Sequence, residues 1–274
     1  MATPKRLPTP FPRKRFGQHF LESAWVAKVI RAIDPQATDH FIEIGPGRGA
    51  LTRPLLARAA DVLAFEIDRD LAAGLRGTDA RLTVVEGDFL ETADGMADRL
   101  SSATRVAGNL PYNVASPILF KLIDLHAAGR PLVDATLMLQ REVADRLTAH
   151  PGGREYGVLS ILVQHAADVD LLLALPPGAF RPPPKVRSAL VRIRFRPARP
   201  TVHDLGVFRT LVQAVFTRRR KTLANALLAF PLTARLPPDA ALKRAEIDGR
   251  RRPETLAIEE FGRLADVFAV GVTP

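Results

Sequence analysis

The chain has 274 residues, of which 47% are hydrophobic and 25% charged, a composition that excludes disordered and collagen-like proteins and is typical of a folded soluble one. It has no cysteine, which excludes disulfide scaffolds, zinc–thiolate sites and thiol nucleophiles and favours a cytoplasmic protein. Its 39 lysines and arginines against 29 aspartates and glutamates give a formal net charge of +10.

The first 21 residues form a basic segment with five lysines and arginines and no acid. Prolines at positions 4, 8, 10 and 12 oppose an amphipathic helix, and no apolar stretch follows, so a signal or transit peptide is not expected. We expect residues 1–21 to be an extended basic arm. No segment of the chain reaches the roughly 18 consecutive apolar residues of a membrane span.

Strand and helix patterns alternate between residues 22 and 150. Helices are expected at 25–33, 50–59, 69–75, near 96–101, and at 116–129 and 141–150. Strands are expected at 40–44, 62–68, 82–88, 104–109 and 135–140. This alternation predicts an α/β fold with a parallel sheet that is covered on both faces.

The remainder of the chain follows a different pattern. A helix at 156–167 and a strand at 169–177 precede a regular alternation over 186–195, which predicts an antiparallel strand pair that closes the sheet. The segment 196–200 has the composition of a linker, and helical patterns at 208–230 and 253–270 predict a small helical domain. We therefore expect three parts: the arm at 1–21, a main α/β domain at 22–200 and a helical domain at 201–274.

A glycine turn follows the first strand. Gly45 and Gly47, in the segment 43–49, permit positive φ and close approach of a ligand, and the helix that follows presents free N–H groups. Alone, this turn also fits a dinucleotide site. Glu66 at the end of the second strand is suited to ribose hydroxyls, and Asp88 at the end of the third to an adenine amine. Each acid also fits an ordinary strand-end or capping residue, but the pair favours S-adenosylmethionine over NAD.

The motif that carries chemistry follows the fourth strand, at the edge where open α/β sheets bind their ligands. It reads Gly108-Asn109-Leu110-Pro111-Tyr112. An exocyclic aromatic amine is a weak nucleophile because its lone pair is delocalised into the ring, and two acceptors aimed at its hydrogens localise that pair. The side-chain oxygen of Asn109 and the carbonyl of Leu110 suit this role. Pro111 stiffens the turn and Tyr112 offers a face for stacking; the alternative is a turn with purely local hydrogen bonds.

These residues belong to a longer set of motifs that spans most of the chain. They are RKRFGQHFL (13–21), EIGPGRGALT (43–52), FEIDRDLA (65–72), GNLPYN (108–113), LMLQREVADRL (137–147), YGVLS (156–160), FRPPPKVRSA (180–189) and FTRRRKTLANAL (216–227). On these motifs the chain closely resembles the KsgA family of small-subunit ribosomal RNA adenine dimethyltransferases.

The resemblance implies a Rossmann-like class I methyltransferase with a mostly parallel seven-stranded sheet and a small all-α C-terminal domain. It implies transfer of four methyl groups from S-adenosylmethionine to the N6 amines of two adjacent adenosines. Their site is a hairpin loop near the 3′ end of 16S rRNA in a pre-30S particle, which implies a role in 30S biogenesis. We expect a cytoplasmic monomer that needs no metal. The family's cofactor contacts fall here on His19, Leu21, Gly45, Glu66, Asp88 and Asn109, and the glycine turn adds Gly47 to the candidates for cofactor binding.

Phe180 opens the segment FRPPPKVRS, and by the resemblance it holds the flipped base opposite Tyr112. Three prolines make a stiff loop there. Stacking on an aromatic ring is worth roughly 1–3 kcal/mol and extrusion of a base costs a few kcal/mol, so two rings about offset the cost. The alternative for Phe180 is core packing. His19 stands where relatives often have asparagine, so its cofactor contact comes either from a ring nitrogen or only from the backbone.

The net charge is unevenly distributed along the chain. Residues 22–170 contain 15 basic and 21 acidic groups, residues 171–221 contain 12 basic groups and one acid, and residues 222–274 contain seven of each. An acidic body with basic segments indicates docking on nucleic-acid phosphates, and a solvated basic surface is the alternative. The RNA-binding candidates are Lys14, Arg15, Lys185, Arg187, Arg218, Arg219, Arg220 and Lys221.

We expect residues 218–221 to lie in a helix, where four consecutive cations fan over most of the circumference. Some of them then meet phosphates and others pair with acids. The same basic half of the chain also contains Arg192, Arg194, Arg196 and Arg199.

Other functions stay open. A 23S rRNA adenine methyltransferase of the macrolide-resistance type shares the chemistry, but such proteins usually have Ser-Ile-Pro-Tyr or similar at the catalytic turn and lack the RRRKT segment. A binding protein that keeps the fold without catalysis is disfavoured by the intact turn at 109–112. An NAD-dependent oxidoreductase needs a proton relay that the sequence does not suggest, and the six histidines show no metal-ligand spacing.

Overall fold

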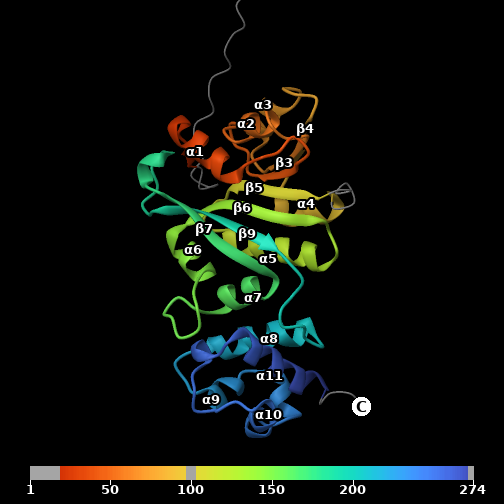
Figure 1. Ribbon diagram of the computed structural model, residues 1–274, viewed down its shortest axis with the longest axis vertical. Helices are drawn as coiled ribbons and strands as arrows, with labels where there is room; N and C mark the ends of the chain where they lie inside the picture. Colours follow the sequence, from red (N-terminus) through yellow and green to blue (C-terminus); the bar gives the residue numbers. More distant parts are fainter. Residues whose placement is uncertain (1–18, 97–102, 271–274) are drawn as a thin grey trace, which may run out of the picture. The chain divides into compact units, whose positions relative to one another are not determined.

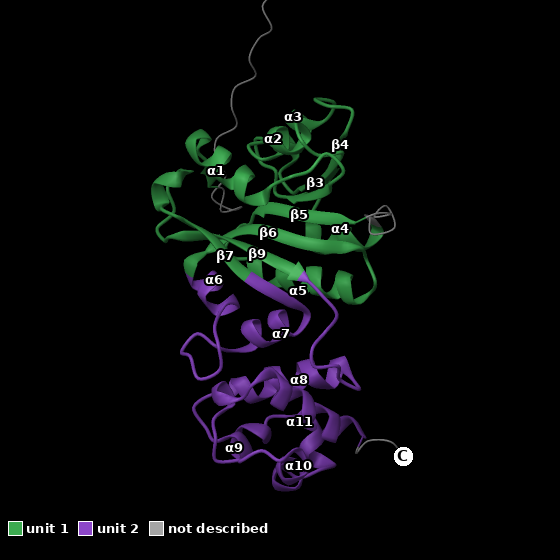
Figure 2. Ribbon diagram, in the orientation of Figure 1, with its two compact units in different colours: residues 1–141, 170–194 green, residues 142–169, 195–274 purple. Residues whose placement is uncertain are grey.

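The structure is a computed structural model that describes residues 19–96 and 103–270 (Figure 1). Most of the expected basic arm, including Lys14 and Arg15, and most of the helix expected near 96–101 lie outside the described residues. The chain forms two compact units (Figure 2), one of residues 1–141 and 170–194 and the other of residues 142–169 and 195–274. The domain boundary between residues 200 and 201 stays a prediction.

A seven-stranded sheet has the strand order β4-β3-β2-β5-β6-β9-β7. Its strands are β2 (His40–Ile44), β3 (Asp61–Glu66), β4 (Leu82–Glu86), β5 (Thr104–Asn109), β6 (Leu132–Gln140), β7 (Ala167–Leu175) and β9 (Ser188–Phe195). β2 is parallel to β3 and β5, β3 is parallel to β4, and β5 is parallel to β6, whereas β9 is antiparallel to β6. This confirms the predicted mostly parallel sheet of seven strands.

The α-helices that the structure describes in the first unit are α1 (Ser23–Ile33), α2 (Thr52–Leu56), α3 (Arg69–Leu75), α4 (Phe89–Met96) and α5 (Ala115–Ala127). α1 ends where Asp34 turns to a left-handed φ of 53° before Pro35. The guanidinium of Arg105 on β5 donates to the carbonyl of Ile33 at 2.8 Å, which satisfies one of the acceptors that a helix end leaves without an intrahelical partner. The helices predicted at 25–33 and 69–75 are therefore confirmed, the second at the same bounds.

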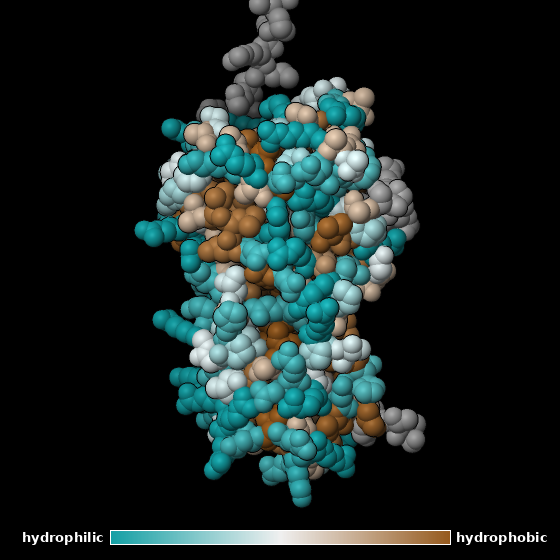
Figure 3. Space-filling model, viewed as in Figure 1, coloured by the Kyte–Doolittle hydropathy of each residue, from teal (hydrophilic) through white to brown (hydrophobic). Residues whose placement is uncertain are grey.

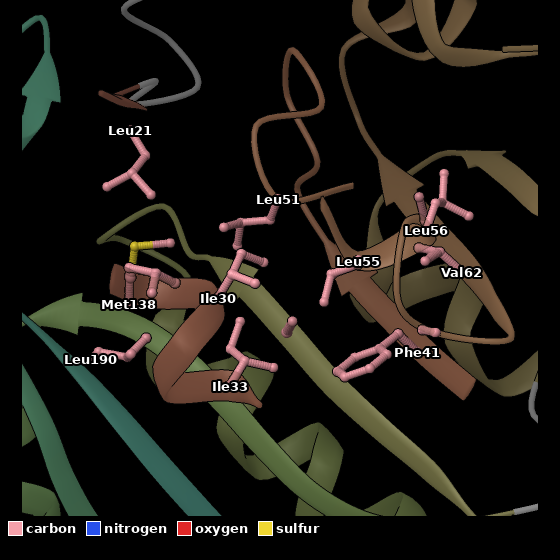
Figure 4. Packing of buried hydrophobic residues seen from close by; sticks show 14 of the residues in the cluster. Leu21, Ile30, Ile33, Phe41, Leu51, Leu55, Leu56, Val62, Met138 and Leu190 are labelled. Atoms are coloured by element: carbon pink, nitrogen blue, oxygen red, sulfur yellow. The ribbon is translucent and has the colours of Figure 1, made fainter. Parts of the chain in front are cut away.

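The core of the first unit lies between α1, α2 and the sheet. Val29, Ile30 and Ile33 come from one face of α1 and are at most 2% exposed. Figure 4 shows Ile30 and Ile33 extending from the helix over the strands, in the same cluster as Leu55 and Phe41. Full burial of each such side chain stabilises the fold by about 1.5–3 kcal/mol, so the helical spacing at 25–33 is explained by this contact.

A second, two-stranded sheet brings the start of the described chain to the segment before β9. β1 (Phe20–Leu21) pairs antiparallel with β8 (Phe180–Arg181), which follows the short 3-10 helix η3 (Pro177–Ala179). Leu21 lies opposite Phe180 in the register. This pairing is not apparent from periodicity, because each strand has only two residues.

The second unit is mainly helical. Its α-helices are α6 (Arg141–Leu147), α7 (Val158–Ala166), α8 (Leu205–Thr217), α9 (Leu223–Leu227), α10 (Pro238–Ala245) and α11 (Ile258–Val270). Two 3-10 helices, η4 (Pro231–Ala234) and η5 (Pro253–Thr255), lie between them. The helical pattern predicted at 253–270 corresponds to η5 and α11, and the one predicted at 208–230 is divided into α8 and α9. The helix α10 was not predicted from the sequence.

The expectation that residues 218–221 lie in a helix is wrong. α8 ends at Thr217, whose hydroxyl donates to the carbonyl of Ala214 at 2.7 Å. Thr222 is extended and begins α9, so Arg218 to Lys221 form a turn between two helices. Like charges three or four residues apart destabilise a helix, and threonine favours the position that starts one.

No helix in the described ranges is long and apolar enough to cross a membrane. Figure 3 shows hydrophilic residues over most of the face in view, with smaller hydrophobic areas between them.

Candidate active site

A cavity of about 750 Å³ lies at the edge of the sheet where the parallel strands end. Gly45 and Gly47 follow β2, Glu66 ends β3, and Asp88 comes two residues after β4. Asn109 ends β5, and the structure brings all five residues into the wall of this cavity. Because the carboxyl ends of parallel strands meet at one edge, motifs far apart in the sequence converge here.

The glycine turn has the backbone conformation that the sequence predicted. Gly45 has a φ of 70° and Gly47 has a φ of 58°, values that residues with a Cβ atom rarely adopt. The N–H of Gly47 donates to Glu66 Oε2 at 2.9 Å. A Cβ at position 47 would lie 3.2 Å from the ring of Phe20, so both conformation and space favour glycine.

Glu66 and Asp88 both accept hydrogen bonds from backbone groups, which is the capping role that the sequence left open. Glu66 is 4% exposed, and its second oxygen accepts from the Asp68 N–H at 2.9 Å. Burial raises the pKa of Glu66, although the bonds from the N–H groups of Asp68 and Gly47 oppose that shift. Asp88 Oδ1 accepts from the Leu90 N–H at 2.9 Å. Both acids hold backbone groups and still line the cavity.

Glu43 is a site residue that sequence reasoning missed. It lies within β2, is 1% exposed, and lines the cavity, and its Oε2 has no hydrogen-bond partner in the described part of the chain. Burial raises the pKa of Glu43 to about 7, with a smaller contribution from the nearby charge of Glu66 and an opposing one from Thr52. An acid inside the otherwise apolar strand FIEI is the signal that identifies it.

The turn at 109–112, the candidate catalytic turn, is held by the residue before β1. Asn109 Nδ2 donates to the backbone carbonyl of His19 at 2.7 Å. This assigns the nitrogen end of the amide to His19 and leaves the Oδ1 end as an acceptor for another group. Leu110 and Pro111 line the same cavity, and Leu110 is 1% exposed. The turn therefore has contacts beyond the local ones that were the alternative.

Tyr112 is half-buried in the cavity wall and has two partners. Its hydroxyl lies 2.8 Å from Ser188 Oγ. Its ring is stacked on the ring of His19, with 5.7 Å between centroids and 24° between planes. Burial raises the pKa of Tyr112, and the hydrogen bond with Ser188 opposes the shift. His19 and Leu21, the remaining candidates for cofactor binding, also line the cavity.

Phe180 lies elsewhere than expected. It is 2% exposed, belongs to the hydrophobic cluster with Leu21 and Met138, and is not part of the cavity wall. Successive residues of a strand face opposite sides, so on β8 Arg181 lines the cavity while Phe180 packs into the core. Phe180 thus has the core packing that the sequence left as the alternative, and its stacking on a base stays a prediction.

The basic candidates fall into two groups. Lys185 and Arg187 are exposed between β8 and β9, and Arg218, Arg220 and Lys221 are exposed in the turn after α8.

Arg219 differs from its neighbours in that turn because it is partly buried. It donates to the Gly153 carbonyl at 3.2 Å and lies 3.9 Å from Glu254. Arg192, Arg194 and Arg196 are likewise paired with acids, namely Asp134, Asp170 and Asp168.

The sheet order, the glycine turn after β2 and the acids after β3 and β4 define a class I methyltransferase. A family model described as ribosomal RNA adenine dimethylase matches residues 12–269. The chain belongs to the ribosomal RNA adenine dimethylase family.

Individual relatives agree with this assignment. A protein named ribosomal RNA small subunit methyltransferase A from Acinetobacter baylyi is 43% identical over 93% of this chain and 91% of its own length. A protein of the same name from Syntrophotalea carbinolica is 44% identical over 94% of this chain and 97% of its own length.

Two solved structures share the fold over most of the chain. A dimethyladenosine transferase from Plasmodium falciparum has a TM-score of 0.74 and 27% identity, covering 90% of this chain and 96% of that one. The 23S rRNA methyltransferase ErmE has a TM-score of 0.65 and 26% identity, covering 91% of this chain and 99% of that one.

Proposed function

We propose that this protein uses S-adenosylmethionine to dimethylate the N6 amines of two adjacent adenosines in the 3′-terminal hairpin loop of 16S rRNA. The observation that carries the proposal is the orientation of Asn109, whose nitrogen is bound to the His19 carbonyl and whose oxygen is left to accept from a substrate amine. The family, and relatives named for small-subunit ribosomal RNA, support this substrate.

The residues of the cavity fit S-adenosylmethionine. Gly45 and Gly47 leave the backbone open to close approach, and Glu66 and Asp88 supply acceptors for hydroxyl and amine groups. The unpartnered Oε2 of Glu43 provides a buried acceptor for a cationic group. When bound, S-adenosylmethionine supplies an electrophilic methyl group. His19 and Leu21 complete the set of residues that would hold it.

The chain's contribution to the reaction is to activate and place the amine. Asn109 Oδ1 and the Leu110 carbonyl accept hydrogen bonds from the two amine hydrogens, which localises the lone pair on nitrogen. Tyr112 supplies a face on which the base stacks. No ionised base is needed for this step, and the rate depends on how accurately the acceptors are held.

The substrate particle and setting complete the proposal. We propose action on a pre-30S particle in the cytoplasm, by a monomer without a metal, in the course of 30S biogenesis. The exposed cations Lys185, Arg187, Arg218, Arg220 and Lys221 are proposed to contact rRNA phosphates.

A 23S rRNA methyltransferase is the second candidate, because ErmE shares the fold over most of the chain. The intact Asn109-Leu110 pair and the basic turn after α8 favour the 16S substrate.

The test is single-turnover methylation with labelled S-adenosylmethionine on three substrates: undermethylated 30S particles, free 16S rRNA and 50S particles. We expect label in the 30S particles, in two adjacent dimethylated adenosines. Label found only in 50S particles would assign the 23S activity instead. No label in any substrate, with retained binding to 30S particles, would assign a binding protein.

A further inference from the structure

The ring of Tyr112 is held from two directions by parts of the chain that are distant in sequence. Its hydroxyl meets Ser188 Oγ at 2.8 Å, and one of its two faces is stacked on the ring of His19. Tyr112 itself lies in a turn between β5 and α5. A turn restrains a side chain less than a strand does. The orientation of the Tyr112 ring is therefore set by these two partners.

Ser188 is a rigid support. It is the first residue of β9, it is 2% exposed, and it lies opposite Gln140 of β6 in the ladder. The backbone beside it is fixed as well, since the Arg141 N–H donates to the Arg187 carbonyl at 2.9 Å. A hydroxyl placed on a paired strand has few positions available, so its hydrogen bond fixes where the end of the Tyr112 ring lies.

His19 restrains the same turn from the other direction. Its Nδ1 lies 2.7 Å from the Pro182 carbonyl, which only accepts, so Nδ1 carries a proton and donates. The ring is thereby tied to the loop between β8 and β9 while it stacks on Tyr112. The carbonyl of the same residue receives Asn109 Nδ2. One residue thus contacts both functional side chains of the catalytic turn.

We propose that Ser188 and His19 are positioning residues that set the orientation of Tyr112, Ser188 through the hydroxyl and His19 through the ring face. The use of this orientation to stack a base rests on the proposed function, whereas the orientation itself does not. A ring that is free to rotate presents its face to the base for a smaller fraction of the time. Loss of the hydroxyl contact is therefore expected to slow methyl transfer by about twofold to tenfold, the usual worth of a neutral hydrogen bond.

The placement is tested first without any activity measurement. The chain has two tyrosines, Tyr112 in the first unit and the buried Tyr156 in the second, so ring-labelled tyrosine gives two assignable sets of NMR signals. Ser188→Ala and His19→Ala should each shift the Tyr112 signals and leave those of Tyr156 in place. Ser188→Thr, which keeps a hydroxyl, and Ser116→Ala on α5, which removes one outside the cavity wall, should leave both sets unchanged.

A double-mutant cycle then separates positioning from a structural role. Ser188→Ala and Tyr112→Phe should each slow single-turnover transfer, with the affinity for S-adenosylmethionine unchanged. In the Tyr112→Phe background, Ser188→Ala should have no further effect, because the hydroxyl on which it acts is gone. A merely structural serine would slow both backgrounds equally.

The outcomes are distinct. Unmoved Tyr112 signals in Ser188→Ala and His19→Ala, or rate effects that multiply in the cycle, would overturn the positioning roles. A shift of the Tyr156 signals as well would mean that the substitution disturbs the whole fold. In that case the test rests on the Ser188→Thr and Tyr112→Phe variants instead. If the unaltered protein transfers no methyl group to any particle, the proposed function fails while the NMR measurement still decides the placement.

Discussion

The side-chain amide of Asn109 has a donor end and an acceptor end, and the His19 carbonyl binds the donor end. The acceptor end that the proposed chemistry requires is therefore left available by a backbone group 90 residues away in sequence. Asparagine supplies both functions in one side chain. A carboxylate of the same shape supplies only acceptors, which makes aspartate a sharper test than alanine.

We expect Asn109→Asp to lower the rate of methyl transfer by about 10²–10³, the usual cost of losing one preorganised hydrogen-bonding group at a reacting centre. The carboxylate would be repelled by the His19 carbonyl and turn away from its position. Single-turnover rates on 30S particles measure the effect, with Asn225→Asp on α9 as the matched control. A rate within threefold of the unaltered protein would show that the donated bond is dispensable.

Glu43 gives the folded protein a specific pH dependence. Its pKa is raised from 4.5 to about 7 by burial, so the native state binds this proton more tightly than the unfolded chain. The stability that comes from the proton is present below pH 4.5 and is lost as the pH rises through 7. We expect the free energy of unfolding to fall by roughly 2–3 kcal/mol between pH 5 and pH 8 because of this group.

The Glu43→Gln variant should lack that fall, since the amide does not ionise. Urea unfolding at several pH values measures it, and Glu91→Gln, an exposed position on α4, is the control that should keep the pH dependence. A fall of equal size in Glu43→Gln would assign the pH dependence to other groups.

Two parallel strands approach closely just before the turn at 109–112. A Cβ at Gly108 would lie 2.6 Å from the carbonyl oxygen of Ile44, and Gly108 lies opposite Ile44 in the β2–β5 register. Glycine is therefore required here by the spacing of two strands, not by a special φ. A larger residue at position 108 would affect both strands, because any added atom must push β2 and β5 apart beneath the site.

We expect Gly108→Ala to destabilise the protein by about 1–3 kcal/mol, as overpacking in a filled interior does, and to slow methyl transfer. Thermal and urea unfolding measure the first effect. Gly74→Ala on α3 is the control, since its Cβ would meet nothing within 4 Å and should be neutral or stabilising by about 0.5–1 kcal/mol. An equally stable Gly108→Ala variant would contradict the predicted clash.

The basic residues 218–221 were expected in a helix, and their place in a turn changes which of them are expected to contact RNA. Residues 218–221 leave the helix, so they do not fan around its axis. Arg219 points to Gly153 and Glu254 within the second unit, while Arg218 and Arg220 stay exposed. Within this one short motif, Arg219 therefore makes contacts inside the protein, whereas Arg218 and Arg220 are exposed to solvent.

For the molecule as a whole, fewer lysines and arginines of segment 171–221 lack an acidic partner than its count of 12 basic residues suggests. In segment 171–221, with its 12 basic residues, several arginines are paired with acids of the same unit: Arg181, Arg192, Arg194, Arg196 and Arg219. Such pairs reduce the number of cations available for phosphates. The proposed RNA contacts therefore fall on the exposed remainder.

We expect Arg218→Ala combined with Arg220→Ala to weaken binding to 30S particles and to lower the salt dependence of log affinity by about two units in slope. Affinity for S-adenosylmethionine and the free energy of unfolding should stay unchanged, because neither side chain is buried. Binding titrations over a range of salt concentrations measure both. The control is Arg58→Ala with Arg76→Ala, two exposed arginines of the first unit. Unaltered particle binding in the Arg218/Arg220 variant would remove this surface from the proposal.

Much of the site was predictable because its parts occur in local patterns. The glycine turn, the strand-end acids and the turn at 109–112 are contiguous motifs, and parallel strands bring their carboxyl ends to one edge. The role of Glu43 and the burial of Phe180 were not predictable in this way. Both depend on what packs against the residue, which no local spacing encodes.

The sequence by itself determined the sheet, most of its helices, the cavity-lining motifs and the family, because periodicity and motif spacing are local properties of the chain. Only the tertiary structure decided which end of the Asn109 amide is bound to the His19 carbonyl, what holds Tyr112, and which arginines are paired with acids. Those answers depend on contacts between residues far apart in the chain, such as His19 with Asn109 and Tyr112 with Ser188. Hydrogen bonds and ion pairs of this kind are set by folded geometry, and the fold therefore completes the site that the motifs begin.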